Sequence, residues 1–128
     1  MIVLLDTSTP VCKLSFVDGA ETYHHEWQAD RELARGLLKY VYDQLQIQGK
    51  DWKNITGLAV FEGPGSFTGL RIGLTVMNTI AASESVPIVG TRGEKWQEQA
   101  LTRLSSAEND QIVLPFYGSE PHITKARK

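Results

Sequence analysis

The sequence is 128 residues long, with 41% hydrophobic and 22% charged residues, a composition typical of one globular domain. Its formal net charge of −2 argues against the broad positive surface that unaided nucleic-acid binding requires. The single cysteine, Cys12, excludes an internal disulfide and a cysteine-based metal cluster. The sequence opens without a basic signal-peptide region and has no apolar run near the ~20 residues that cross a membrane, so we expect a cytoplasmic protein with no membrane contact.

The first 27 residues predict three strands in a meander. Residues 2–5 are a continuous apolar run, which indicates a buried strand, and a hydroxyl-rich turn follows over residues 6–10. A second strand alternates apolar and polar residues, so that one face carries Cys12, Leu14 and Phe16. The dipeptide Asp18-Gly19 is a hairpin signal, and residues 20–27 then form the third strand, paired with the second.

Strands and helices alternate after this meander, which favours a mixed α/β sheet with helices packed on it. Asp30 is a suitable N-cap for a long helix that ends before Gly49, and Ser66 is a suitable N-cap for a second helix. The expected elements are a helix between residues 30 and 49, a strand at 55–61, a helix at 66–83, a strand at 86–89, a helix at 94–104 and a candidate strand at 112–117 before an irregular tail.

The two longer helices have unusually wide apolar faces. Residues placed at steps of ~100° spread over roughly 200° in each helix, about twice the stripe of an ordinary surface helix. One interpretation is that the helices pack on each other and on their own sheet. The other, which we favour, is a protein–protein interface, with Leu37 facing the sheet and a partner contacting Leu38, Tyr42, Leu45, Leu70, Gly73, Leu74, Met77 and Ala81.

The segment GPGSFTGLRIG, residues 63–73, lies between an expected strand and a helix N-terminus, where backbone N–H groups and the helix dipole favour an anion. It is not a Walker A loop, because no Lys-Ser or Lys-Thr stands at the required place. It is not a Gly-x-Ser-x-Gly elbow, because Pro64 occupies the position of the first glycine. The turn at residues 6–9 offers a carboxylate, hydroxyls and backbone donors to a magnesium-bound phosphate.

Nucleophilic and metal chemistry find little support in the sequence. Ser66 has no credible His-Asp partners. His24 and His25 are adjacent in a strand, so they point to opposite faces and cannot share a metal ion. We therefore expect no catalytic residue and no metal site.

Two motifs together carry a family resemblance. The strand IVLLDTST resembles the opening of actin/Hsp70/sugar-kinase-like lobes, and GPGSFTGLRIG is similar to the signature of the bacterial TsaB (YeaZ) family. The resemblance implies a single ribonuclease-H-like lobe with a mixed five-stranded sheet over residues 1–104. Residues 105–128, a loop, a short strand and a basic tail, stand where the family has a second lobe.

The resemblance also implies a role. The chain would be a non-catalytic partner that binds and activates TsaD, and with TsaE, ATP and Mg²⁺ the complex would transfer a threonylcarbamoyl group to the adenosine beside the tRNA anticodon. The chain would have no cofactor of its own and would reach tRNA only through the complex. Without a second lobe, we expect weak ATP binding at a vestigial phosphate site made of Asp6, Thr7, Ser8, Gly63, Gly65 and Ser66.

Other interpretations stay open beside this one. The chain could be a minimal nucleotide-binding phosphotransferase or ATPase completed by dimerisation. A protease is a third interpretation, against which the missing His-x-x-x-His motif argues. A homodimer could form in the absence of TsaD. Three basic residues in the last four, Lys125, Arg127 and Lys128, are expected either to contact TsaD or tRNA phosphate, or to have no role.

Overall fold

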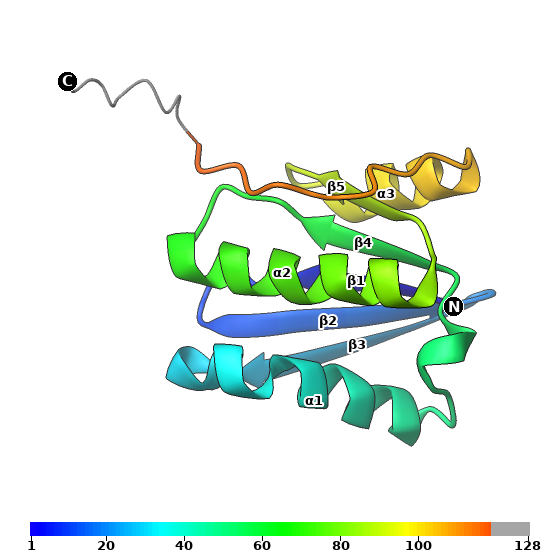
Figure 1. Cartoon of the computed structure of the whole chain (residues 1–128), viewed down its shortest axis with the longest axis horizontal. Coiled ribbons are helices and arrows are strands. Elements are labelled where there is room, and N and C mark those ends of the chain that lie inside the picture. The colour runs from blue at the N-terminus through cyan, green and yellow to red at the C-terminus, as the bar shows by residue number, and fades with distance from the viewer. Residues whose placement is uncertain (119–128) are drawn as a thin grey trace.

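A five-stranded mixed sheet forms the centre of the protein (Figure 1). The computed structural model describes residues 1–118. Strands 1, 2 and 3 form an antiparallel meander, and strands 4 and 5 are added parallel to strand 1 on its other side. The strands, in the spatial order β3-β2-β1-β4-β5, are β1 (Ile2–Asp6), β2 (Val11–Asp18), β3 (Glu21–Gln28), β4 (Gly57–Phe61) and β5 (Ile88–Thr91).

Three α-helices cover the sheet: α1 (Leu33–Ile47), α2 (Phe67–Glu84) and α3 (Trp96–Ser105). Figure 1 shows α2 lying in front of β1, and α1 packs beside α2. Helix α3 packs on β4 and β5 through a separate apolar cluster on the opposite face. Two 3₁₀ turns, η1 (Asp30–Glu32) and η2 (Trp52–Asn54), flank α1.

The alternation of side chains along β1 explains why the core has two parts. Val3 and Leu5 belong to the larger cluster under α1 and α2, whereas Leu4 belongs to the smaller cluster under α3. Successive residues of a strand point to opposite faces. A strand that is covered on both faces therefore has a continuous apolar run, as β1 does.

Most of the predicted elements are present. The hairpin of β2 and β3 turns at Gly19, which has a φ of 64° and so adopts the left-handed conformation that glycine allows. Ser66 is the N-cap of α2, and its side chain accepts a hydrogen bond from the Gly69 N–H at 3.1 Å. The α/β fold class with a mixed five-stranded sheet is confirmed.

The expected start of the first helix was wrong. Asp30 is not its N-cap: this residue lies in η1 with a φ of 48°, and α1 begins at Leu33. Within residues 1–118, no side-chain hydrogen bond caps that end of α1. The sequence shows a capping residue type, but the 3₁₀ turn moves the N-cap of the helix two residues along the chain, to Glu32.

The fifth strand begins at Ile88, two residues later than expected, because the chain must first leave α2. Ser85 ends that helix with a left-handed φ of 56°, and the Val86 N–H still bonds to the Ala81 carbonyl. The third helix likewise begins at Trp96, not at residue 94.

The expected strand at residues 112–117 is absent from the described chain. Instead this segment crosses α2 and returns towards β4. The side chain of Asn78 donates to the Val113 carbonyl and accepts from the Val113 N–H, both at 2.9 Å. The Phe116 N–H then donates to the Glu62 carbonyl at 2.7 Å. Residues 119–128, with the expected basic tail, lie outside the described residues.

Candidate functional site: the glycine-rich turn and the face of α1 and α2

The turn between β4 and α2 packs directly against the turn between β1 and β2. The Ser66 N–H donates to the Ser8 carbonyl at 2.8 Å, and the Thr7 hydroxyl donates to the Gly69 carbonyl at 2.7 Å. The Ser8 N–H donates to Asp6 Oδ1 at 2.8 Å. The structure thus brings together the two turns that the sequence singles out, although they lie about 60 residues apart in the chain.

Three glycines make this contact possible. A Cβ atom added at Gly65 would overlap Ser8, and one added at Gly69 would overlap the Thr7 carbonyl oxygen. At Gly73 it would overlap the Thr7 hydroxyl. The Gly69/Gly73 spacing therefore serves the approach of α2 to the β1–β2 turn inside this chain. Gly73 does not face a partner, and its prediction as an interface residue was wrong.

The hydrogen bonds within these two turns limit how tightly the turns can bind an anion. The Ser8 N–H, the Ser66 N–H and the Thr7 hydroxyl would be natural donors to a phosphate, but each already has an acceptor within the protein. An anion at this site would have to compete with them or use other backbone groups at the start of α2. The geometry fits a weak anion site better than a tight one.

The two strand histidines lie away from these turns, and Cys12, close to Asp6, is buried. His24 and His25 are on β3, two strands from β1, and they do point to opposite faces. Burial, with a contribution from Asp6, raises the pKa of Cys12 to about 12, so its thiol stays protonated near neutral pH. Within residues 1–118 there is no group of three or more His, Cys, Asp or Glu side chains that could hold a metal ion.

A Ser–His pair on β2 and β3 was missed by sequence reasoning. Ser15 Oγ lies 2.7 Å from His24 Nδ1 on the outer face of the sheet. The two-residue hairpin loop places these residues directly opposite each other, so the register could have revealed the pair. Ser15 is only 5% exposed, which leaves its hydroxyl out of reach of a substrate.

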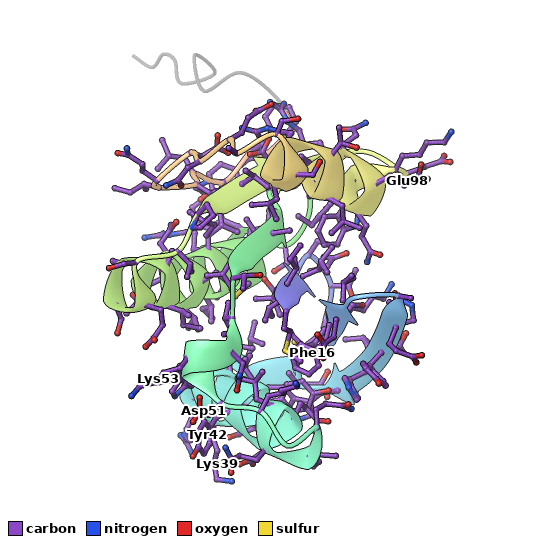
Figure 2. The ribbon with its side chains drawn as sticks, turned by 90° about the vertical axis from the view of Figure 1, so that its right-hand side faces the viewer. Phe16, Lys39, Tyr42, Asp51, Lys53 and Glu98 are labelled. Carbon is purple, nitrogen blue, oxygen red and sulfur yellow. The ribbon has the colours of Figure 1, made fainter. Side chains whose placement is uncertain are left out.

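The outer side of α1 carries two of the predicted interface residues at the surface. Leu38 is 53% exposed and Tyr42 is 38% exposed, one turn apart on the helix. The Tyr42 ring lies 5.5 Å from that of Trp52. In Figure 2, Phe16 lies inside the layer between the sheet and α1, whereas Tyr42 and Lys39 lie at the outer edge of α1.

The remaining predicted interface residues are inside the protein. Each is buried by the sheet, by the other helix or by the β1–β2 turn, so none can contact a partner at the surface of this chain. The expectation that they line an exposed face is therefore corrected for Leu45, Leu70, Gly73, Leu74, Met77 and Ala81.

A groove between α1 and α2 was not predicted. One part has a volume of about 410 Å³, and a second part of about 680 Å³ continues towards the glycine-rich turn. Both parts are lined by Ala34, Thr68 and Ile72, and two arginines, Arg31 and Arg71, contribute to the walls. The sequence signal was the row of small residues on the weakly polar side of the second helix, where bulky side chains would have filled the space.

The sheet order, the parallel addition of β4 and β5, and the paired turns define a ribonuclease-H-like lobe of the actin/Hsp70 type. Within residues 1–118, no helix is long and apolar enough to span a membrane.

Comparison with known proteins gives the family. Residues 27–92 match the family model described as TsaD, tRNA N6-adenosine threonylcarbamoyltransferase. The chain is 33% identical over 113 residues to the tRNA threonylcarbamoyladenosine biosynthesis protein TsaB of Escherichia coli K12, covering 83% of the chain and 48% of that protein. It is 30% identical over 108 residues to TsaB of Haemophilus influenzae, covering 84% of the chain and 46% of that protein.

Solved structures agree with this match. YeaZ from Pseudomonas aeruginosa superposes with a TM-score of 0.68 at 28% identity, covering 77% of the chain and 49% of that structure. The chain belongs to the TsaB (YeaZ) family. It spans about half the length of the curated relatives that it matches.

Proposed function

We propose that this chain is an accessory subunit in threonylcarbamoyladenosine biosynthesis that binds and activates TsaD without contributing a catalytic group. The observation that carries the proposal is the exposed apolar pair Leu38 and Tyr42, one turn apart on the outer side of α1. The names of the TsaB relatives and the TsaD family model support the pathway.

The chemistry of this surface suits a protein partner. Tyrosine is among the residue types that most often dominate binding energy at interfaces, and the exposed Leu38 extends the apolar surface beside Tyr42. Tyr42 is held in place by its ring contact with Trp52, and the neighbouring Lys39 and Asp43 form an ion pair of 2.7 Å. These contacts reduce the side-chain entropy that binding would cost.

The direct test uses purified TsaD with two variants of this chain. Leu38→Asp should weaken TsaD binding at least about tenfold, because truncating or charging a central apolar contact costs about 2 kcal/mol or more. Leu114→Asp is the matched control: it places the same charge on an apolar residue that is also exposed, but on the segment that crosses α2. Equal TsaD binding by the two variants would overturn the proposal.

Transfer activity gives a second measurement. With TsaD, TsaE, ATP, Mg²⁺ and tRNA present, the wild-type chain should stimulate threonylcarbamoyl transfer, and Leu38→Asp should reduce that stimulation as much as it reduces binding. The chain alone should neither modify tRNA nor retain it at physiological salt, since tRNA is reached only through the complex.

The alternative function, a minimal ATPase or phosphotransferase, requires tight nucleotide binding at the paired turns. The internal hydrogen bonds of Ser8, Ser66 and Thr7 argue against it. Calorimetry of the chain with Mg-ATP should give a dissociation constant weaker than micromolar, corresponding to less than about 8 kcal/mol of binding free energy. Micromolar binding together with ATP hydrolysis would favour the alternative.

A further inference from the structure

Two stacked aromatic rings lie at the surface where α2 begins. Phe67 is the first residue of α2, and Tyr117 belongs to the segment that crosses this helix; their ring centroids are 4.5 Å apart, with 27° between the ring planes. Figure 1 shows the described part of that segment reaching the start of α2. Phe67 is nevertheless 55% exposed and Tyr117 is 41% exposed. The pair therefore leaves aromatic surface open to a further flat group.

Two arginines add positive charge beside these rings. The Arg71 guanidinium lies 5.2 Å from the centre of the Phe67 ring, and Arg31 lines the adjoining part of the groove between α1 and α2. Within residues 1–118, no ion pair joins either arginine to an acidic side chain. Asp30, which also lines the groove, accepts a hydrogen bond from Gln28 at 2.8 Å. The surface thus complements a ligand that has both a flat ring and negative charge.

We propose that Phe67, Tyr117 and Arg71 form a stacking surface for an unpaired nucleotide of single-stranded RNA, whose sugar–phosphate chain continues into the groove past Arg31. Unpaired bases stack on aromatic rings and guanidinium planes, and arginines neutralise the phosphates between them. Such binding tolerates any base, because every base has a flat face. The choice of tRNA as the source of the unpaired nucleotide rests on the proposed function, in which tRNA is the substrate of the pathway.

The position and the polarity of this surface favour RNA over a protein partner. Phe67 follows the carboxyl end of β4, which runs parallel to β1, and open α/β sheets bind their ligands at the carboxyl ends of parallel strands. The side chains that flank Phe67 are hydrophilic and exposed: Ser66, Thr68 and Arg71. Aromatic residues that anchor a protein partner are normally enclosed by neighbours that exclude water. Rings flanked by hydroxyl and guanidinium groups suit bases and phosphates instead.

The small size of the surface explains why the chain alone should not retain tRNA at physiological salt. Two arginines neutralise about two phosphates, and the formal net charge of the chain is −2. Binding that depends on so few phosphate contacts is weak, and it is best measured at low salt. In the complex, TsaD would hold the tRNA close to this surface, so that a weak contact contributes to the total affinity.

Stacking is tested with the chain alone and a short, unpaired, fluorescein-labelled RNA oligonucleotide, by fluorescence anisotropy at low salt. The wild type should bind, and Phe67→Leu should bind about tenfold more weakly, because it keeps an apolar side chain but removes the ring. Tyr42→Leu is the matched control: it removes an exposed ring on α1 and should leave RNA binding unchanged. Unlabelled duplex RNA should compete poorly, since its bases are already stacked and paired. Circular dichroism checks that both variants are folded.

The salt dependence of binding tests the arginines separately from the ring. Arg71→Ala and Arg31→Ala should each reduce the slope of log K against log salt concentration by about 0.7, the value for one phosphate contact on a single strand. Phe67→Leu should lower the affinity at every salt concentration and leave this slope unchanged.

A third measurement, with TsaD present, separates RNA from a protein as the occupant. Phe67→Leu should raise the KM for tRNA and leave TsaD binding unchanged. The oligonucleotide measurements use the chain alone, so RNA binding and the proposed TsaD binding can fail independently. A wild-type chain that does not bind the oligonucleotide at low salt would overturn the RNA proposal, as would equal affinities of Phe67→Leu and Tyr42→Leu or efficient competition by duplex RNA. Loss of TsaD binding by Phe67→Leu, with RNA binding unchanged, would assign the surface to a protein partner.

Discussion

Helices α1 and α2 have the same wide apolar pattern in the sequence, but their apolar residues are buried to different extents in the fold. Helix α1 lies at the side of the layer: it buries Leu37 and leaves Leu38 and Tyr42 at the surface. Helix α2 lies at the centre, between the sheet, α1, the β1–β2 turn and the segment at residues 109–117. Its predicted interface residues, Leu70, Gly73, Leu74, Met77 and Ala81, are all buried within the chain. A wide apolar face therefore indicates that a helix is packed on more than one side. The elements that pack against it can all belong to the same chain.

The largest effect expected from this difference is at Leu74. This residue is 3% exposed and belongs to the main core, so Leu74→Asp would bury an unpaired charge. We expect a loss of more than ~4 kcal/mol of stability, enough to unfold a domain of ordinary stability. Loss of the cooperative thermal transition in circular dichroism would show it. A folded Leu74→Asp chain would mean that α2, like α1, has a free side.

A smaller loss is expected at Asn78, which ties α2 to the segment that crosses it. Asn78→Ala removes both hydrogen bonds to the buried Val113 backbone and should cost about 2 kcal/mol. Urea denaturation measures this loss. Thr79→Ala, an exposed change on the same helix, is the control and should cost less than about 0.5 kcal/mol.

Gly73 tests the close approach of α2 to the β1–β2 turn. Gly73→Ala places a methyl group against the Thr7 side chain and should destabilise the protein by about 1–2 kcal/mol, despite the better helix propensity of alanine. In a Thr7→Ala background the same change should cost clearly less, because the hydroxyl oxygen and the methyl group are gone and only the Cβ atom of residue 7 remains, 3.1 Å from the added methyl group. Additive losses in this double-mutant cycle would contradict the packing explanation.

The smallest effect on stability is expected at Leu38. Leu38→Asp should change the free energy of unfolding by about 0.5 kcal/mol or less, because the residue is already largely in water. Leu38→Asp is also the variant that we expect to bind TsaD more weakly. An unchanged melting temperature together with lost binding would separate the outer side of α1 from the core most clearly. A melting temperature that falls as it does for Leu74→Asp would remove the distinction between the two helices.

Local chemistry explains which features could be predicted. The hairpin follows from Asp18-Gly19 because glycine accepts the positive φ of the turn. The start of α2 follows from Ser66, whose hydroxyl reaches the Gly69 N–H. The same logic failed at Asp30, where a 3₁₀ turn precedes the helix. A residue type can favour a cap, but it does not exclude a competing turn nearby.

At the candidate site, too, the local chemistry could be predicted from the sequence and the long-range contacts could not. The sequence of residues 6–9 and 63–66 was enough to predict that both turns carry groups suited to binding a phosphate. That their donors are engaged with each other depends on contacts between Ser8 and Ser66 and between Thr7 and Gly69, which no local pattern contains. The α1–α2 groove is equally a product of packing, because small side chains such as Ala34 leave space only where two helices meet.

The α/β class, the meander, the alternation of later strands and helices, and the absence of a Walker A loop could all be predicted from the residues alone. These features depend on side-chain period, glycine conformation and capping, all of which act over a few residues. Which apolar residues remain at the surface follows from the packing of distant elements, because the burial of a side chain depends on the element that packs against it. Leu38 and Leu74 are the same residue type on similar helices, and their neighbours alone make one a surface residue and the other core.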